Sequence, residues 1–234
     1  MIPISDDNPA RLVPVVTWAI ILSCAIVFAW ELSLGRGMAP ALALLGFTPA
    51  ALGHALPPPP GYVSVPVWAT IFTSMFLHGG FLHIGGNMLY LWIFGNNVED
   101  AMGHLRYLLF YLICGVAAAL TLAAINPASP VPMIGASGAI SGVLAAYVLL
   151  YPRARVTVIV PLGIILYPMK ISAIWVVGFW FVLQLLSAAL GGQADSGVAW
   201  WAHIGGFLAG GLLTPMFKSA QFPLFGEVRR GPWG

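Results

Sequence analysis

The sequence predicts an all-α, polytopic membrane protein, and three observations lead to this fold class. Of the 234 residues, 60% are hydrophobic and only 7% are charged, whereas a soluble domain carries about 25% charged residues. Nine Lys or Arg and seven Asp or Glu residues are too few to cover the surface of a soluble globule. The apolar runs are continuous rather than alternating, which excludes a lipid-facing β-barrel, and this hydrophobicity excludes a disordered chain.

The positions of the charges predict six membrane-spanning helices. A spanning helix needs about 20 mostly apolar residues, and five long stretches of the chain lack any Asp, Glu, Lys or Arg. Proline- and glycine-rich breaks divide one of these stretches into two spans and leave another with a single span. The predicted spans are residues 12–30, 82–101, 105–125, 137–151, 171–194 and 196–217.

The basic residues predict the orientation of these spans. If the N-terminus is cytoplasmic, eight of the nine basic residues lie at inner ends or in inner loops, and only Arg36 lies outside. This is a strong positive-inside bias. We therefore expect both termini in the cytoplasm, and a bacterial inner membrane as the location. The eight are Arg11, Arg106, Arg153, Arg155, Lys170, Lys218, Arg229 and Arg230.

Two connecting segments need separate treatment. Residues 34–81 form a long outer connection that is apolar but rich in Pro and Gly, and we expect it to lie in the membrane interface with Tyr62 and Trp68 at headgroup depth. Residues 156–169 are β-branched and bounded by prolines, which predicts an inner-face loop or a hairpin dipping into the interface. No internal repeat supports a transporter built from inverted repeats.

The domain organisation and the classes of bound group follow from the same reading. We expect a short cytoplasmic segment over residues 1–11, a six-span membrane domain over 12–217 and a cytoplasmic tail over 218–234. Both cysteines fall within predicted spans, so neither a disulfide nor a metal framework is expected. The sequence indicates no cofactor. No basic cluster extends beyond Arg229 and Arg230, so no nucleic acid is expected either.

Polar residues converge at one depth in three of the predicted spans. The second, fourth and sixth spans begin at the outer face, and His83, Asn87, Ser137 and His203 each lie within about two turns of those beginnings. Polar groups at membrane depth are costly unless they are paired, and they mark candidate functional sites. His83 and Asn87 are four residues apart, so they share a helix face.

Small residues predict how the fourth and sixth spans pack. Stripes of small residues let two helices approach closely in lipid, and each span carries one: Gly138 and Gly142 on the fourth, Gly206 and Gly210 on the sixth. Close packing would bring Ser137 within hydrogen-bonding reach of His203. An adjacent imidazole activates a serine hydroxyl as a nucleophile. Free N–H groups at the start of the fourth span, with His83 and Asn87, would stabilise a developing oxyanion.

Taken singly, these residues also have structural interpretations. Serines are common near the ends of membrane helices, and a lone histidine can bridge helices or bind a metal. His78 and His83 are five residues apart, which is the wrong spacing for a metal-binding pair on a helix, so no zinc site is predicted. Glu99, Asp100 and Arg106 are interpreted as an inner-end charge cluster that fixes helix position. Together, however, a serine, a histidine and a His/Asn pair at one depth on three different spans favour a catalytic site.

With these motifs in order, the sequence resembles the rhomboid intramembrane serine proteases over residues 12–217. The matching motifs are His83-x-x-x-Asn87 with His78 before it, Gly135-Ala136-Ser137-Gly138, and Ala202-His203-x-x-Gly206-x-x-x-Gly210. The resemblance implies a Ser137–His203 dyad with Ser137 as nucleophile and His203 as general base. It implies that His83 and Asn87 serve the oxyanion, that His78 is an auxiliary residue in the same cluster, and that Glu99 matches an acidic residue ending the second span.

The sequence therefore predicts a serine endopeptidase that cleaves transmembrane segments of membrane proteins near the outer face. A non-enzymatic factor that binds single spans without cutting them is an alternative, and a transporter or channel is a weaker one. The loop 191–197 is rich in glycine and is expected to cap the site, with the fifth span as a lateral gate. Some family members place an aromatic residue one turn after the nucleophile to hold the histidine; that position is Ser141, so the group that orients His203 is left open.

Overall fold

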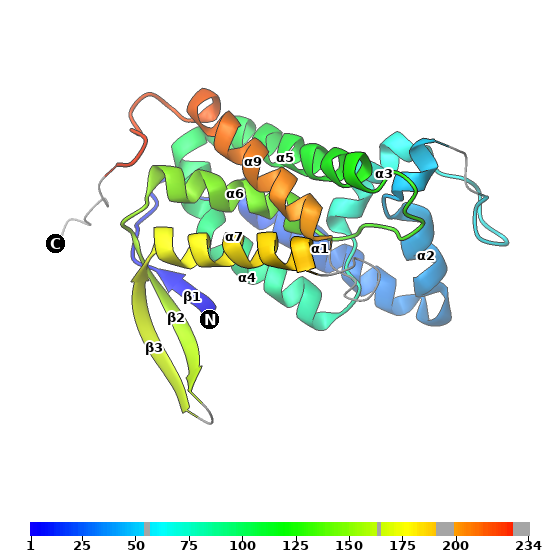
Figure 1. The fold of residues 1–234 in the computed structure, drawn as a ribbon, viewed down its shortest axis with the longest axis horizontal. Helices are drawn as coiled ribbons and strands as arrows, with labels where there is room; N and C mark the ends of the chain where they lie inside the picture. The colour runs from blue at the N-terminus through cyan, green and yellow to red at the C-terminus, as the bar shows by residue number, and fades with distance from the viewer. Residues whose placement is uncertain (54–56, 163–164, 191–198, 227–234) are drawn as a thin grey trace.

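The protein is a bundle of long helices with a small sheet at one end (Figure 1). The computed structural model describes residues 1–53, 57–162, 165–190 and 199–226. Each predicted span coincides with one long helix. These helices are α1 (Val15–Ser33), α4 (Phe81–Met102), α5 (His104–Ile125), α6 (Ser137–Leu150), α7 (Ala173–Leu190) and α9 (Trp200–Phe217).

Length and hydropathy identify only some of these helices as membrane spans. Among the described residues, α1, α5 and α7 are long and apolar enough to cross a bilayer. The pair Val67–Phe76 and Phe81–Met102, bent by 82°, is either a broken fourth span or a re-entrant loop. With 14 residues, α6 is about 21 Å long at 1.5 Å per residue, and the hydrocarbon core is about 30 Å thick. The chain is thus a polytopic helical membrane protein, and the count of six spans stays a prediction.

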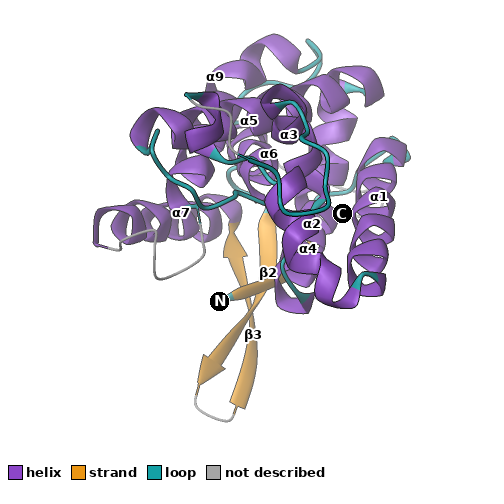
Figure 2. Ribbon diagram, turned by 90° about the vertical axis from the view of Figure 1, so that its right-hand side faces the viewer, coloured by secondary structure: helices purple, strands orange, loops and turns teal. Residues whose placement is uncertain are grey.

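Helix α6 lies at the centre of the bundle. It packs against α4, α5 and α9, and 11 of its 14 residues are buried. By contrast, α7 lies at the edge and buries only Ala173, Val176, Val177 and Gln184 (Figures 1 and 2). The helix that begins with Ser137 is therefore enclosed by protein, while α7 presents most of its length to the surroundings.

The long connection after α1 is partly helical. It contains α2 (Met38–Leu45), α3 (Val67–Thr73) and three short 3₁₀ turns at Gly35–Gly37, Pro49–Leu52 and Ser74–Phe76. Trp68 is 67% exposed and Tyr62 is 38% exposed, as an interfacial position requires, but their depth in a bilayer stays a prediction. Phe47 pairs with Met133 in an isolated bridge, which ties this connection to the loop before α6.

A three-stranded antiparallel sheet lies at the end of the bundle opposite α2 and α3 (Figure 1). Strands β2 (Arg155–Leu162) and β3 (Ile165–Ser172) form a hairpin, so the hairpin is the correct one of the two interpretations of residues 156–169. The first strand, β1 (Ile2–Asp6), pairs with β2 and was not foreseen in the segment 1–11. The sheet thus joins the N-terminus to the connection between α6 and α7.

Candidate active site

Ser137 is the first residue of α6, and an unusual backbone conformation precedes it. Gly135 has a φ of +112°, a value that residues with a Cβ atom rarely adopt. A Cβ atom there would lie 2.6 Å from Nε2 of His83. The Gly135 amide donates to the carbonyl of Ser74 at 2.8 Å. Glycine at 135 therefore lets the turn bring the His83 ring against the backbone next to Ser137.

Glycines set the distance between α6 and α9. A methyl group added at Gly206 would overlap the carbonyl of Gly138, and one added at Gly210 would overlap the backbone of Gly142. Gly138 and Gly142 in turn face Ala118 and Cys114 of α5, with no room for a side chain. The helices therefore touch backbone to backbone, which fixes the position of His203 on α9 relative to Ser137 on α6.

Ser137 and His203 are within hydrogen-bonding distance. Oγ of Ser137 lies 2.8 Å from Nε2 of His203, a distance at which an imidazole can take up the hydroxyl proton. The other ring nitrogen of His203, Nδ1, lies 2.7 Å from Oε1 of Gln184 on α7. Ser141 lies one turn after Ser137, and its hydroxyl donates to the carbonyl of Ser137 at 2.6 Å rather than to the imidazole.

Gln184 is the polar neighbour of His203 whose role the sequence did not predict. The sequence analysis left the orienting group of His203 open. The available signal was an amide in the apolar part of the fifth predicted span, where an unpaired polar group is costly. Only the folded arrangement of α7 beside α9 shows that this amide reaches His203.

His83 and Asn87 on α4 present nitrogen atoms to the same region. The amide of Gly79 donates to Nδ1 of His83 at 3.4 Å, which leaves Nε2 as the ring nitrogen that carries hydrogen. Within the part of the chain that the structure describes, the side-chain nitrogen of Asn87 is buried and has no hydrogen-bond partner. A buried donor without a partner is costly, so the Asn87 nitrogen suits an acceptor that arrives from outside the chain, and His83 lines the same cavity.

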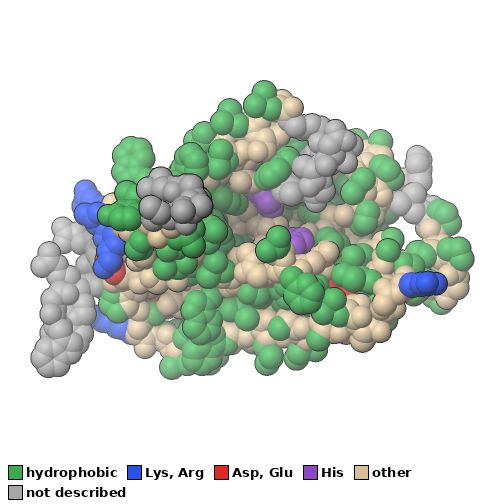
Figure 3. All heavy atoms as spheres, turned by 90° about the horizontal axis from the view of Figure 1, so that it is seen from below, with side chains coloured by type: hydrophobic (Ala, Val, Ile, Leu, Met, Phe, Trp, Pro, Cys, Tyr) green, Lys and Arg blue, Asp and Glu red, His purple; other side chains and the backbone are tan. Residues whose placement is uncertain are grey.

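A cavity of about 830 Å³ joins these residues. Ser137, His203, His83 and Asn87 all line it, together with Trp180 of α7 and Met133 of the loop before α6. Figure 3 shows histidine side chains at the bottom of a hollow in one face of the molecule. On that face, Lys and Arg side chains gather toward the two ends and leave the band between them apolar (Figure 3).

His78 lies behind His83 and does not line the cavity. It is fully buried, and its ring centroid is 5.1 Å from that of His83. Its backbone amide donates to the buried carboxylate of Glu31 at 3.1 Å, and its Nδ1 lies 3.1 Å from the carbonyl of Phe76. These contacts support the His83 ring rather than the cavity. Among the described residues, no three His, Cys, Asp or Glu side chains group as metal ligands.

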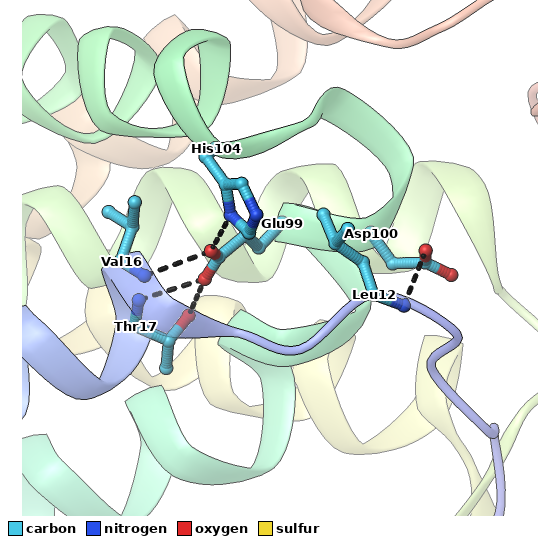
Figure 4. A network of polar contacts seen from close by, with 6 residues as sticks. All are labelled: Leu12, Val16, Thr17, Glu99, Asp100 and His104. Carbon is cyan, nitrogen blue, oxygen red and sulfur yellow. Dashed lines mark hydrogen bonds and ion pairs between the residues drawn. The ribbon is translucent and has the colours of Figure 1, made fainter.

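Two members of the predicted charge cluster, Glu99 and Asp100, do not line the cavity and lie beside the residues at the start of α1 (Figure 4). The fully buried carboxylate of Glu99 accepts from the amides of Val16 and Thr17 at 2.9 and 2.8 Å and from the hydroxyl of Thr17 at 2.7 Å. Nδ1 of His104 lies 2.6 Å from the same carboxylate. Glu99 thus bonds the free amides of the first turn of α1.

Two predicted features fall outside the described residues. The loop 191–197, expected to cap the site, lies within the undescribed stretch 191–198. Arg229 and Arg230 lie beyond residue 226.

Comparisons with known proteins point to one family. Residues 66–220 match the family model of the rhomboid domain. The chain is 32% identical over 169 residues to RHOMBOID-like protein 1 of Arabidopsis thaliana, which covers 72% of this chain and 39% of that protein. It is 40% identical over 79 residues to the rhomboid protease GluP of Bacillus subtilis (34% of this chain, 15% of that protein). It is 38% identical over 88 residues to the chloroplastic rhomboid-like protein 11 of Arabidopsis thaliana (38% and 31%).

In each of these alignments the matched part spans less than half of the relative's length. The family model, however, covers more than half of this chain and includes α3, α4, α5, α6, α7 and α9. Every long helix except α1 lies within that match, as do the serine at the start of α6 and the histidine on α9. The chain belongs to the rhomboid family.

Proposed function

We propose that this chain is an intramembrane serine endopeptidase that uses Ser137 as its nucleophile and His203 as its general base. The observation that carries the proposal is the 2.8 Å separation between Oγ of Ser137 and Nε2 of His203 at a cavity that is also lined by Asn87, whose buried side-chain nitrogen has no partner among the described residues. Two of the relatives have names that describe proteases, the rhomboid protease GluP and a rhomboid-type serine protease 2 from Emericella nidulans.

The geometry supports a two-step acyl transfer. Oγ of Ser137 attacks the carbonyl carbon of the scissile bond while Nε2 of His203 takes the hydroxyl proton. The tetrahedral intermediate collapses when His203 returns that proton to the leaving amine, which leaves an acyl ester on Ser137. A water molecule, deprotonated by His203, then attacks the ester and releases the carboxyl product and the free hydroxyl.

The oxyanion of each tetrahedral intermediate needs hydrogen-bond donors, and α4 and α6 supply them. Nε2–H of His83 and the amide nitrogen of Asn87 line the same cavity as Ser137. The first backbone N–H groups of a helix have no partner within that helix, and α6 begins at Ser137. Donors aimed at a developing charge in a water-poor site are usually a large contribution to the rate.

Substrates follow from the location of the site. In a membrane helix, the backbone carbonyl is held by its own helical hydrogen bond, so the cleaved segment must unwind before Ser137 reaches it. We therefore propose transmembrane segments of other membrane proteins as substrates, with helix-breaking residues near the cut and a small residue before it. The predicted orientation places the cut near the outer face, where water has the shortest path to the cavity.

The compartment is a separate matter from the orientation. Among the relatives, one is chloroplastic and others are mitochondrial, including rhomboid protein 1 of Saccharomyces cerevisiae. The predicted bacterial inner membrane is therefore unsupported by the comparisons. The proposal is limited to a multi-pass protein whose basic inner ends face the more negative compartment.

Covalent labelling and cleavage together test this function. Purified protein in liposomes should be labelled on Ser137 by a fluorophosphonate and should cut a transmembrane model substrate, while Ser137→Ala and His203→Ala should lose at least about 10⁴-fold in rate. Ser141→Ala is the matched control, because its hydroxyl bonds the carbonyl of its own helix; it should keep the label on Ser137. A folded wild type that neither labels nor cuts would favour the non-enzymatic binding factor, and full cleavage by Ser137→Ala would exclude the dyad.

A further inference from the structure

The side-chain amide of Gln184 lies between its own helix and the imidazole of His203. Its nitrogen donates to the carbonyl of Trp180 at 3.2 Å, one turn earlier on α7. Its oxygen lies 2.7 Å from Nδ1 of His203. Gln184 is 5% exposed and is the one buried polar side chain of α7 among the described residues. Both ends of this amide are therefore engaged.

These two contacts determine which way the amide faces. A carbonyl oxygen accepts and cannot donate, so the atom of Gln184 that faces Trp180 must be the nitrogen. The oxygen then faces His203 and accepts from Nδ1–H. A neutral imidazole carries hydrogen on only one nitrogen, so Nε2 is left with its lone pair directed at the hydroxyl of Ser137. This is the tautomer that a general base requires.

We infer that Gln184 is a positioning residue that completes a Ser137–His203–Gln184 relay, with the amide oxygen in place of the carboxylate of a serine-protease triad. The inference rests on the proposed function, since it assigns a role to Gln184 only if His203 is the base. Neutral side chains serve as the third group in some proteases, as in Cys-His-Asn sites. Here a neutral acceptor also avoids burying a charge within the membrane.

The other described groups near His203 do not accept a hydrogen bond from its Nδ1–H. Ser141 donates to the carbonyl of Ser137, and in the described part of the chain no carboxylate bonds to His203. The rings of Trp180 and Trp200 lie 6.0 and 6.1 Å from the imidazole, centroid to centroid, and restrict its tilt. Neither indole accepts a hydrogen bond from Nδ1, so ring packing alone does not select the tautomer.

Two substitutions at position 184 separate orientation from packing. Gln184→Met keeps the length of the side chain and removes the strong acceptor, whereas Gln184→Glu keeps an acceptor oxygen. We expect Gln184→Met to lose about 10–100-fold in kcat, the usual effect of removing a group that orients a functional histidine, with KM within about twofold of the wild type. Gln184→Glu should recover most of that loss. Leu185→Met on the exposed side of α7 is the matched control and should behave as wild type.

Labelling of Ser137 distinguishes the possible failures. If the wild type is not labelled by the fluorophosphonate, the proposed function fails, and the role of Gln184 fails with it. If the wild type is labelled and Gln184→Met is labelled and cleaves at the same rate, the relay is excluded while the dyad stands. If Gln184→Met and Gln184→Glu both lose activity and both have a lowered thermal midpoint, Gln184 is a packing residue and the inference is overturned. Slow labelling of a Gln184→Met variant with an unchanged thermal midpoint supports the relay.

Discussion

The two ends of α4 hold polar clusters of opposite character. At its C-terminal end, Glu99 is fully buried and its carboxylate accepts from the backbone and side chain of α1, with His104 alongside (Figure 4). At its other end, His83 and Asn87 face a cavity, and the amide nitrogen of Asn87 has no partner among the described residues. Both clusters cost energy to bury, but only the first is satisfied by the chain itself.

This difference in hydrogen bonding distinguishes polar residues that stabilise the bundle from polar residues that are available to bind a ligand. Removing a satisfied buried group strands its partners and lowers stability. Removing a donor that has no partner removes a desolvation cost and should leave stability unchanged or slightly higher, at the expense of whatever the donor was to bind. Substitutions in the two clusters should therefore affect different measurements.

The largest expected effect on stability is at Glu99. Glu99→Ala leaves the amides of Val16 and Thr17 without their acceptor at the start of α1, and we expect it to lower the free energy of unfolding by about 3–5 kcal/mol, the cost of breaking a buried charged contact. Asp100→Asn is the matched control. Asp100 accepts from the backbone amides of Arg11 and Leu12 at 3.2 and 3.1 Å, and these contacts are less buried than those of Glu99. Chemical unfolding in detergent measures both. Equal stability of Glu99→Ala and wild type would contradict a structural role.

Asn87 should show the opposite pattern. Asn87→Ala is expected to reduce kcat for a transmembrane substrate about 10²–10³-fold, the usual loss when one oxyanion donor is removed. Its thermal midpoint should equal or exceed that of the wild type, since the lost nitrogen has no partner within the described chain. Single-turnover cleavage and a thermal melt of the same preparation check the two statements. A marked loss of stability would place Asn87 with Glu99 rather than with the site.

The smallest expected effect concerns Asp6, which accepts a hydrogen bond from Tyr147 in the C-terminal half of α6. Burial raises the pKa of Asp6 to about 6; the hydrogen bond from Tyr147 opposes this rise and the charge of Asp7 adds to it. Because the folded pKa lies above the unfolded one, folding favours the protonated form. The contribution of Asp6 to stability is therefore full below about pH 4 and is lost as the pH rises through about 6.

Thermal midpoints of wild type and Asp6→Asn at pH 5 and pH 7.5 test this sign. The wild type should lose more stability than Asp6→Asn between the two values, because asparagine does not titrate but can still accept from Tyr147. A larger loss in the variant would reverse the assigned direction. Such a result would mean that folding favours the charged form of Asp6.

Local composition was sufficient to predict the long helices. Each predicted span overlaps one long helix, and the break at Asn126-Pro127 directly follows the end of α5. These ends are predictable because charges and prolines act on the segment that contains them. Strand β1 was not predictable in this way. Ile2–Asp6 is a five-residue segment containing a proline, and it becomes a strand only by pairing with β2, about 150 residues later in the chain.

The residues of the candidate site also differ in whether local sequence or a distant contact determines them. Ser137 and His203 could be selected from the sequence for two reasons. Both lie near the predicted outer ends of their spans, and the spacing of the glycines predicts that these two spans pack closely. The structure places their reactive atoms 2.8 Å apart, and their catalytic roles remain proposals. Gln184 could be noticed as an amide in an apolar span, but its partner could not be named, because the rotation of α7 about its axis decides whether position 184 faces α9 or lipid.

The location of Gln184 has a consequence for the order of events during turnover. Its helix, α7, is the least enclosed of those around the cavity, with Trp175, Phe179 and Leu186 at its exposed side. If a substrate segment enters by displacing α7, the same displacement withdraws the amide from His203 and switches off the base. The enzyme would then be inert while open and competent only after α7 returns. Membrane proteins that contact the site only briefly, while α7 is displaced, would not be cleaved. Selectivity would therefore depend on the residence time of a segment as well as on its sequence.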